Sequence, residues 1–160
     1  MARPIRILFL GDVVGAPGRS AVQKHLPELR AKLAADAVVV NGENIRNGSG
    51  ITADLYRSLR EAGADAVTLG DHVYKDARIT QTLEDPAEPI LRPLNLAEKA
   101  PGKRFVRIPA AGERTRDIFV ATVLGRIRAE KPLVWSFITG EGALWREGPV
   151  ALPEPALRFG

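Results

Sequence analysis

Three acidic residues each follow an apolar run and a glycine, and their carboxylates could bind a metal ion or carry protons. Asp12 follows ILFLG, Glu43 follows VVVNG and Asp71 follows AVTLG. Short apolar runs rich in β-branched residues and bounded by turn formers are typical of buried strands. Because loops that leave the carboxyl ends of parallel strands share one edge of a sheet, we expect the three carboxylates to converge.

Converging carboxylates repel one another unless a cation neutralises them, so the pattern favours a metal site. Oxygen donors from the three acids and from the Asn44 amide suit magnesium, manganese or iron(II). Two such ions bridged by Glu43 could activate water and hold a phosphoryl group during its displacement. His72 could give a proton to the leaving alkoxide. A single acid after a strand is commonly a helix cap or loop residue, so the prediction rests on the repetition.

Two helices are expected between these strands. The first opens near Arg19, and the second follows Thr52, a suitable N-cap, and ends at Gly63. Apolar residues at helical spacing mark the faces that we expect to point inward: Val22, Leu26, Leu29 and Leu33, then Leu55, Leu59 and Ala62. The βαβαβ alternation predicts an α/β fold with a parallel or mixed sheet, flanked by helices and joined by right-handed crossovers.

The second half of the chain is predicted to add shorter elements. A helix is expected around Ala77 to Leu83, and a loop joins two of the later strands as a hairpin. The predicted strands are Ile90 to Arg92, Arg104 to Ile108, Ile118 to Val123 and Val134 to Ile138. From Trp145 onward the pattern predicts only fragments.

Composition restricts the function classes. The 160 residues contain no cysteine, which excludes disulfides, thiolate metal sites and a cysteine nucleophile. The net charge of +4 comes from basic residues that are scattered singly, so a nucleic-acid partner stays open but is not indicated. The apolar run near the N-terminus is too short for a membrane span, and we expect a cytoplasmic protein with no membrane partner. His25, among polar neighbours, is expected at the surface.

Several segments, in order, carry a family resemblance: GDVVGAPGR, VVVNGEN, NGSGIT, ADAVTLGDHVYKD, ILRPLN and APGKRF. Across residues 5 to 127 they closely resemble the bacterial YmdB-type branch of the calcineurin-like metallophosphoesterases, which is similar to 2′,3′-cyclic-nucleotide phosphodiesterases. The resemblance implies a four-layer α/β/β/α fold and hydrolysis of phosphodiester bonds by a metal-activated water. It implies two divalent metal ions (iron, manganese or magnesium) held by Asp12, Glu43, Asn44 and Asp71, with Glu43 bridging and His72 as general acid.

The chain departs from the family pattern in two ways. The family normally has Asn at the position of Asp71, and its second half supplies histidine ligands, whereas this chain has only His25 and His72. We therefore expect a truncated fold, with a metallophosphoesterase-like α/β domain over residues 1–127 and a tail over 128–160 packed on the same domain.

Three hypotheses stay open at this point. The chain could be an active phosphodiesterase acting on a small phosphodiester or nucleotide, with its missing ligands supplied by another subunit or by water. It could be an inactive member that binds a metal or nucleotide or acts in regulation. It could also be the shortened product of a longer gene, with exposed strand edges that favour a homo-oligomer.

Overall fold

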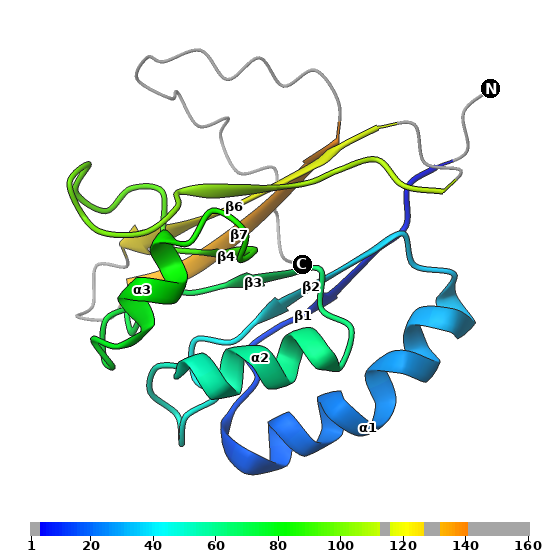
Figure 1. Cartoon of the computed structure of the whole chain (residues 1–160), viewed down its shortest axis with the longest axis horizontal. Helices are drawn as coiled ribbons and strands as arrows, with labels where there is room; N and C mark the ends of the chain where they lie inside the picture. The colour runs from blue at the N-terminus through cyan, green and yellow to red at the C-terminus, as the bar shows by residue number, and fades with distance from the viewer. Residues whose placement is uncertain (1–3, 113–115, 127–131, 141–160) are drawn as a thin grey trace, which may run out of the picture.

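The computed structural model of the chain describes residues 4–112, 116–126 and 132–140. The described residues form three layers, which are helices, a parallel sheet and an antiparallel sheet (Figure 1). This arrangement confirms the predicted α/β class with a parallel sheet flanked by helices. The second helix layer of the four-layer fold implied by the resemblance is not found within these ranges.

The first sheet has four parallel strands, and its strand order follows the order of the chain. Every residue of its second strand is buried, because that strand has a sheet neighbour on both edges and a packed layer on both faces. The strands are β1 (Ile7–Leu10), β2 (Ala37–Asn41), β3 (Ala66–Thr68) and β4 (Ile90–Leu91).

Helices α1 (Gly15–Leu33), α2 (Ala53–Glu61) and α3 (Ile79–Glu84) lie on one face of this sheet (Figure 1). The predicted cap at Thr52 is confirmed, since its hydroxyl oxygen accepts a hydrogen bond of 3.3 Å from the Leu55 backbone amide. None of the described helices is both long enough and apolar enough to span a bilayer.

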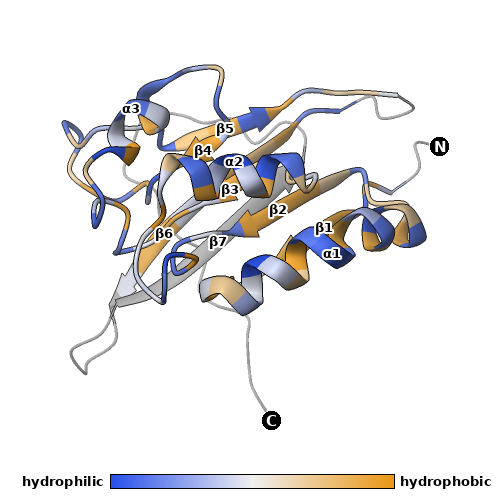
Figure 2. Ribbon diagram, turned by 60° about the horizontal axis from the view of Figure 1, so that its bottom comes forward, coloured by the Kyte–Doolittle hydropathy of each residue, from blue (hydrophilic) through white to orange (hydrophobic). Residues whose placement is uncertain are grey.

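Alternate residues of β2 face two separate cores. Val38 and Val40 pack toward the helices, whereas Ala37 and Val39 pack toward the second sheet. This two-sided burial explains why β2 is an unbroken apolar run rather than an alternating one. Figure 2 shows hydrophobic strands behind helices that also carry hydrophilic residues.

The second sheet is antiparallel and packs on the other face of the parallel sheet. Along its first strand, burial alternates residue by residue, as expected for a sheet with one face on a core. Its strands are β5 (Phe105–Ile108), β6 (Ile118–Arg126) and β7 (Pro132–Gly140). The predicted hairpin between the first two is confirmed, and β7 covers and extends the strand predicted at Val134 to Ile138.

One prediction about α1 is wrong. Leu29 and Leu33 were assigned to the buried stripe, but they are 37% and 47% exposed, while Val22 and Leu26 are buried. The 19 residues of α1 extend for about 28 Å, whereas the five residues of β2 extend for about 16 Å. The last turns of α1 therefore project beyond the sheet that the first turns cover.

Other boundaries differ by a few residues. α1 begins at Gly15, not near Arg19, and α3 begins at Ile79. The segment from Trp145 onward lies outside the described residues. Although β7 falls within residues 128–160 and pairs with β6, the division of the chain at residue 127 stays a prediction.

Candidate metal centre

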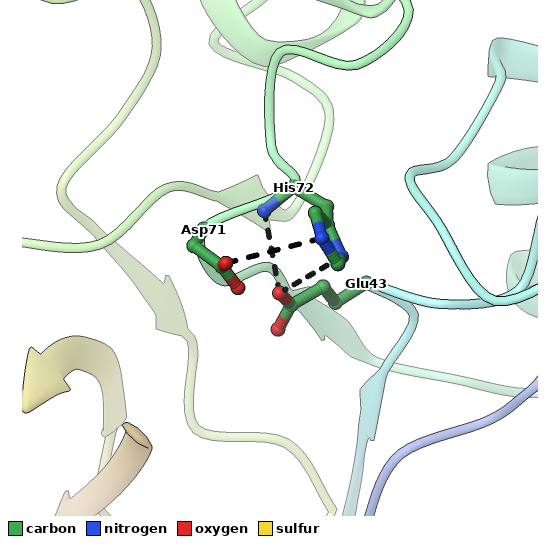
Figure 3. A group of neighbouring side chains, drawn as sticks. All are labelled: Glu43, Asp71 and His72. Atoms are coloured by element: carbon green, nitrogen blue, oxygen red, sulfur yellow. Dashed lines mark hydrogen bonds and ion pairs between the residues drawn. The ribbon is translucent and has the colours of Figure 1, made fainter. Parts of the chain in front are cut away.

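The three acids that follow β1, β2 and β3 lie at the carboxyl edge of the parallel sheet. The side chains of Glu43, Asp71 and His72 meet there, with one ligand atom from each within 4.8 Å of the others (Figure 3). Asp12 joins the group through Asn44, whose amide nitrogen donates to its carboxylate at 2.6 Å. The structure thus brings together all five residues that the sequence singled out.

Glu43 is the buried member of the group, with 4% of its surface exposed. The pKa of Glu43 is raised to about 8, above all by burial, then by a hydrogen bond with the Asp71 carboxyl and by the negative charges of Asp71 and Asp12. The backbone amide of His72 donates to Glu43 Oε1 at 3.3 Å, and this hydrogen bond lowers the pKa of Glu43. Near neutral pH the folded protein therefore keeps a proton on Glu43.

The pKa of Asp71 is shifted in the opposite direction to that of Glu43. This pKa is lowered, first by the hydrogen bond that Asp71 accepts from Glu43 and then by electrostatic interactions with His72 and Lys75. One proton is thus shared between two carboxyl groups and is held on the buried one. Two adjacent carboxyl groups with opposite shifts are typical of sites where a cation or a proton is handled.

The Asn44 amide sets the orientation of His72. Because a carboxylate only accepts hydrogen bonds, the Asn44 nitrogen must face Asp12 and its oxygen must face the imidazole. His72 Nδ1 lies 3.0 Å from that oxygen, so we assign the ring proton to Nδ1. Nε2 is then the nitrogen that can accept and release a proton, and it lies 3.9 Å from an Asp71 oxygen.

The backbone at Asp12 has an unusual conformation, with a φ of +34°. Such angles are costly for residues other than glycine and persist where the surroundings enforce them. Here the next residues are tied to the loop after β2, since the Val13 amide donates to Asn41 O at 3.0 Å and the Gly15 amide to Asn44 O at 3.2 Å. Two site loops are therefore held in register by their backbones.

Sequence reasoning missed two residues that support the site. The Asn41 side chain accepts a hydrogen bond of 3.0 Å from the Glu43 amide, and a polar residue at the end of an apolar strand could have indicated this role. Asp76 is buried and accepts from Arg46 at 3.3 Å and from Arg78 at 2.7 Å. Arg78 is only two residues from Asp76, but the pairing with Arg46, 30 residues away, could not be read from local spacing.

The donor atoms fit a divalent cation. Carboxylate oxygens, an amide oxygen and one imidazole form a mixed hard and borderline ligand set. Burial and the neighbouring acids both disfavour the charged form of Glu43, and a bound cation would replace the proton that now compensates it.

A cavity of about 430 Å³ lies elsewhere, near the amino ends of β3 and β4. Its lining includes Asp65, Pro89 and Phe105 but none of the clustered residues. No imidazole lines it, and its two acids, Asp65 and Glu88, are accompanied by three basic residues, so the candidate site is the cluster at the carboxyl edge.

Comparisons with known proteins agree with this geometry. The chain is 38% identical over 122 residues to a 2′,3′-cyclic-nucleotide 2′-phosphodiesterase of Bacillus subtilis, covering 76% of this chain and 45% of the relative. A crystal structure of a hypothetical protein from Thermus thermophilus superposes with a TM-score of 0.70 at 41% identity, covering 80% and 48% of the two chains. A novel phosphatase from Mycoplasma pneumoniae gives 0.64 at 30% identity, covering 73% and 42%.

The chain spans less than half the length of each of these three proteins. A sequence profile of the family described as YmdB-like protein matches residues 8–147, which is 20 residues beyond the end of the resemblance at residue 127. The match includes all five clustered residues and most of the described strands. The chain belongs to the YmdB-like protein family.

Proposed function

We propose that this chain forms the metal centre of a metal-dependent phosphoesterase that hydrolyses phosphodiester bonds such as those of 2′,3′-cyclic nucleotides. The observation that carries the proposal is the convergence of buried Glu43, Asp71 and His72 at the carboxyl edge of the parallel sheet. Support comes from the Bacillus subtilis relative, named as a 2′,3′-cyclic-nucleotide 2′-phosphodiesterase, and from the Mycoplasma pneumoniae structure, described as a phosphatase.

Asp12, Glu43, Asn44 and Asp71 would hold two divalent cations. Bound cations supply positive charge that polarises the phosphate and stabilises the negative charge that develops as the ester bond breaks. The chain prepares for this role by burying Glu43 and aligning it through Asn41, so that little rearrangement is needed when the proton leaves.

His72 would act as the proton donor. As the P–O bond to the leaving group breaks, a protonated Nε2 would give its proton to the departing oxygen, and the electron pair of the broken bond would stay on that oxygen. The Asn44 oxygen holds the other ring nitrogen at 3.0 Å, and Asp12 in turn holds Asn44. This chain of hydrogen bonds fixes the imidazole plane and keeps Nε2 available.

One observation favours a second function, which is binding of a metal or nucleotide without turnover. The chain has two histidines, and His25 is exposed on α1. Ten residues separate it from Gly15 at the start of the helix, which is about 15 Å along the axis. His72 is therefore the single imidazole that this chain brings to the cluster, and an oxygen-rich site with one imidazole holds transition metals less tightly.

Hydrolysis of bis-p-nitrophenyl phosphate and 2′,3′-cyclic AMP with added manganese tests the proposal. Asp12→Ala and His72→Ala should abolish turnover, and His25→Ala, which changes the exposed histidine, should leave it unchanged. Equal activity in His72→Ala and wild type would contradict the role of His72.

Calorimetric titration with manganese separates the two functions. Manganese binding that Asp12→Ala weakens, in a protein without turnover on either substrate, would support the binding function. An absence of both manganese binding and turnover would contradict the phosphoesterase function and the metal-binding function.

A further inference from the structure

A buried arginine organises the segment that follows β4. Arg92 is 1% exposed, and its guanidinium donates only short-range hydrogen bonds into residues 93–102. All the acceptors are backbone carbonyl oxygens: Pro93 at 2.9 Å, Ala100 at 3.1 Å, Gly102 at 3.2 Å, and Ala97 and Glu98 at 3.4 Å. A planar fork with several donors can hold this many carbonyls at once, which an ammonium group cannot.

Residues 93–103, here called the strap, are also fixed at their ends. The Leu94 amide donates to Thr122 O at 2.7 Å. The Asn95 side chain donates to Leu124 O at 2.7 Å and accepts from the Leu124 amide at 2.8 Å. At the other end, Lys103 O accepts from the Arg92 amide at 2.9 Å. The strap is therefore a rigid bridge between β4 and β6.

The strap contacts the loop that carries the candidate catalytic histidine. The Tyr74 hydroxyl donates to Pro101 O at 2.6 Å. Tyr74 is two residues after His72 in the same short turn, where the Val73 amide donates to Gly70 O at 3.2 Å and the Lys75 amide donates to His72 O at 3.1 Å. A shift at Tyr74 would consequently move His72.

We propose that Tyr74 and Arg92 are positioning residues for His72, with the strap as the rigid element that connects them. Arg92 fixes the conformation of the strap through its hydrogen bonds. Tyr74 connects the strap to the loop that carries Asp71 and His72. The catalytic consequence rests on the proposed function, whereas the ordering of the His72 side chain does not. Preorganisation of this kind matters because displacement of a catalytic group by about 1 Å can cost up to 100-fold in rate.

The composition of the chain provides a matched control. It contains two tyrosines, and Tyr56 donates to Glu88 Oε2 at 2.8 Å from α2. Tyr74→Phe and Tyr56→Phe each remove one hydroxyl and one hydrogen bond of similar length, but only the first touches the strap. A general loss of stability would affect both variants, so it cannot imitate a specific effect of Tyr74.

The first test is heteronuclear NMR of the imidazole Cε1–Hε1 groups in the cation-free protein. The chain gives two such signals, and exposed His25 serves as an internal reference. Tyr74→Phe should broaden or split the His72 signal and leave that of His25 unchanged. Tyr56→Phe should change neither. A His72 signal in Tyr74→Phe that matches wild type would overturn the proposal.

The second test uses Arg92→Lys, which keeps the charge but not the fork. It should change the His72 signal in the same direction as Tyr74→Phe, and the double variant should add little, because both act through the strap. If Arg92→Lys does not fold, the His72 signal of Tyr74→Phe alone decides whether the proposal holds.

In an active enzyme, Tyr74→Phe should lower kcat by roughly tenfold with little change in KM, because His72 acts in the transition state. An unchanged kcat would overturn the proposal. If wild type shows no turnover, the proposed function fails, and the NMR comparison still decides whether the strap positions His72.

Discussion

Two buried carboxyl groups lie on neighbouring loops of the same sheet edge, and their surroundings drive their ionisation in opposite directions. Glu43 faces Asp71 and Asp12, and its pKa is raised to about 8, above all by burial. Asp76 accepts hydrogen bonds from Arg78 and is paired with Arg46, and these hold its pKa at about 2. The Asp76 region supplies its own positive charge, whereas the Glu43 region depends on a proton or an added cation.

The two regions are mechanically joined, although they differ electrostatically. Arg46 belongs to the loop that begins with Glu43, and Asp76 belongs to the loop of His72. The ion pair therefore links the two loops that carry Glu43 and His72. Asp76 is neutralised by two arginines, whereas the cluster around Glu43 is left without such neutralisation.

The largest expected effect is on the pH dependence of stability in the cation-free protein. An acid with a raised folded pKa binds more protons when folded, so Glu43 should lower the free energy of unfolding as pH rises from about 4.5 to about 8. The slope from one such group is about 1.4 kcal/mol per pH unit. Denaturant titration of wild type and Glu43→Gln between these pH values measures it, and parallel curves would contradict the assignment.

Asp76 provides the control of opposite sign. Its lowered pKa means that its contribution is present above pH 3.8 and is lost as pH falls toward 2. The stability difference between wild type and Asp76→Asn should shrink across that acid range and stay constant between pH 5 and pH 8.

The next effect is on cation affinity. Glu43→Gln should weaken manganese binding by roughly 100-fold or more, since loss of even an outer ligand partner costs 10- to 100-fold. Asp76→Asn should change it far less, because Arg46 and Arg78 already neutralise that carboxylate. Calorimetry on wild type, Glu43→Gln and Asp76→Asn measures these affinities. An equal loss in both variants would contradict the difference between the two regions.

Gly50 lies where the two loops touch, and it gives a steric test. A Cβ at Gly50 would lie 2.8 Å from Lys75 Cβ, and the residue has a φ of +80°. Gly48 has a φ of +87° with nothing within 4 Å, so Gly48→Ala isolates the backbone penalty. Gly48→Ala should cost about 1 kcal/mol and Gly50→Ala about 2 kcal/mol.

Only Gly50→Ala should also weaken manganese binding, because it displaces the loop of His72. Thermal unfolding and calorimetry distinguish the two variants. Equal stability and equal affinity in both would show that the loops do not press on each other at this point.

The smallest effect is expected at Arg46. Its side chain is 47% exposed and makes one contact of 3.3 Å with Asp76, which keeps Arg78 as a partner. Arg46→Gln should therefore cost less than about 1 kcal/mol, as for other exposed ion pairs. Denaturant unfolding measures this, and a loss as large as that of Gly50→Ala would make Arg46 the main link between the loops.

Much of the fold could be predicted because it follows local patterns. The run at β2 indicated a strand buried on both faces, and Thr52 indicated a helix start, and both are confirmed. The error at Leu29 and Leu33 has a different origin. Helical spacing shows which face of α1 is apolar, but only the length of the neighbouring strands decides how much of that face is covered.

The residues of the site could be predicted by type but not by environment. The sequence placed Asp12, Glu43 and Asp71 at one sheet edge, and their roles as ligands remain predictions. It did not indicate the strap, the hydrogen bonds by which Arg92 fixes the strap, or the Asp76 ion pairs. The Arg46–Asp76 and Tyr74–Pro101 contacts join residues that are 30 and 27 positions apart, and the contacts of Arg92 within residues 93–102 depend on a loop shape that no regular spacing specifies.

By itself the sequence determined that three strands each end in a glycine and an acid, and parallel pairing then requires these acids to share an edge. The tertiary structure decided which of them keeps a proton. Glu43 and Asp71 have the same local context, but Glu43 is buried whereas Asp71 is exposed. Desolvation penalises the charged form only where other segments exclude water, so the pKa of each acid depends on packing that the sequence pattern does not specify.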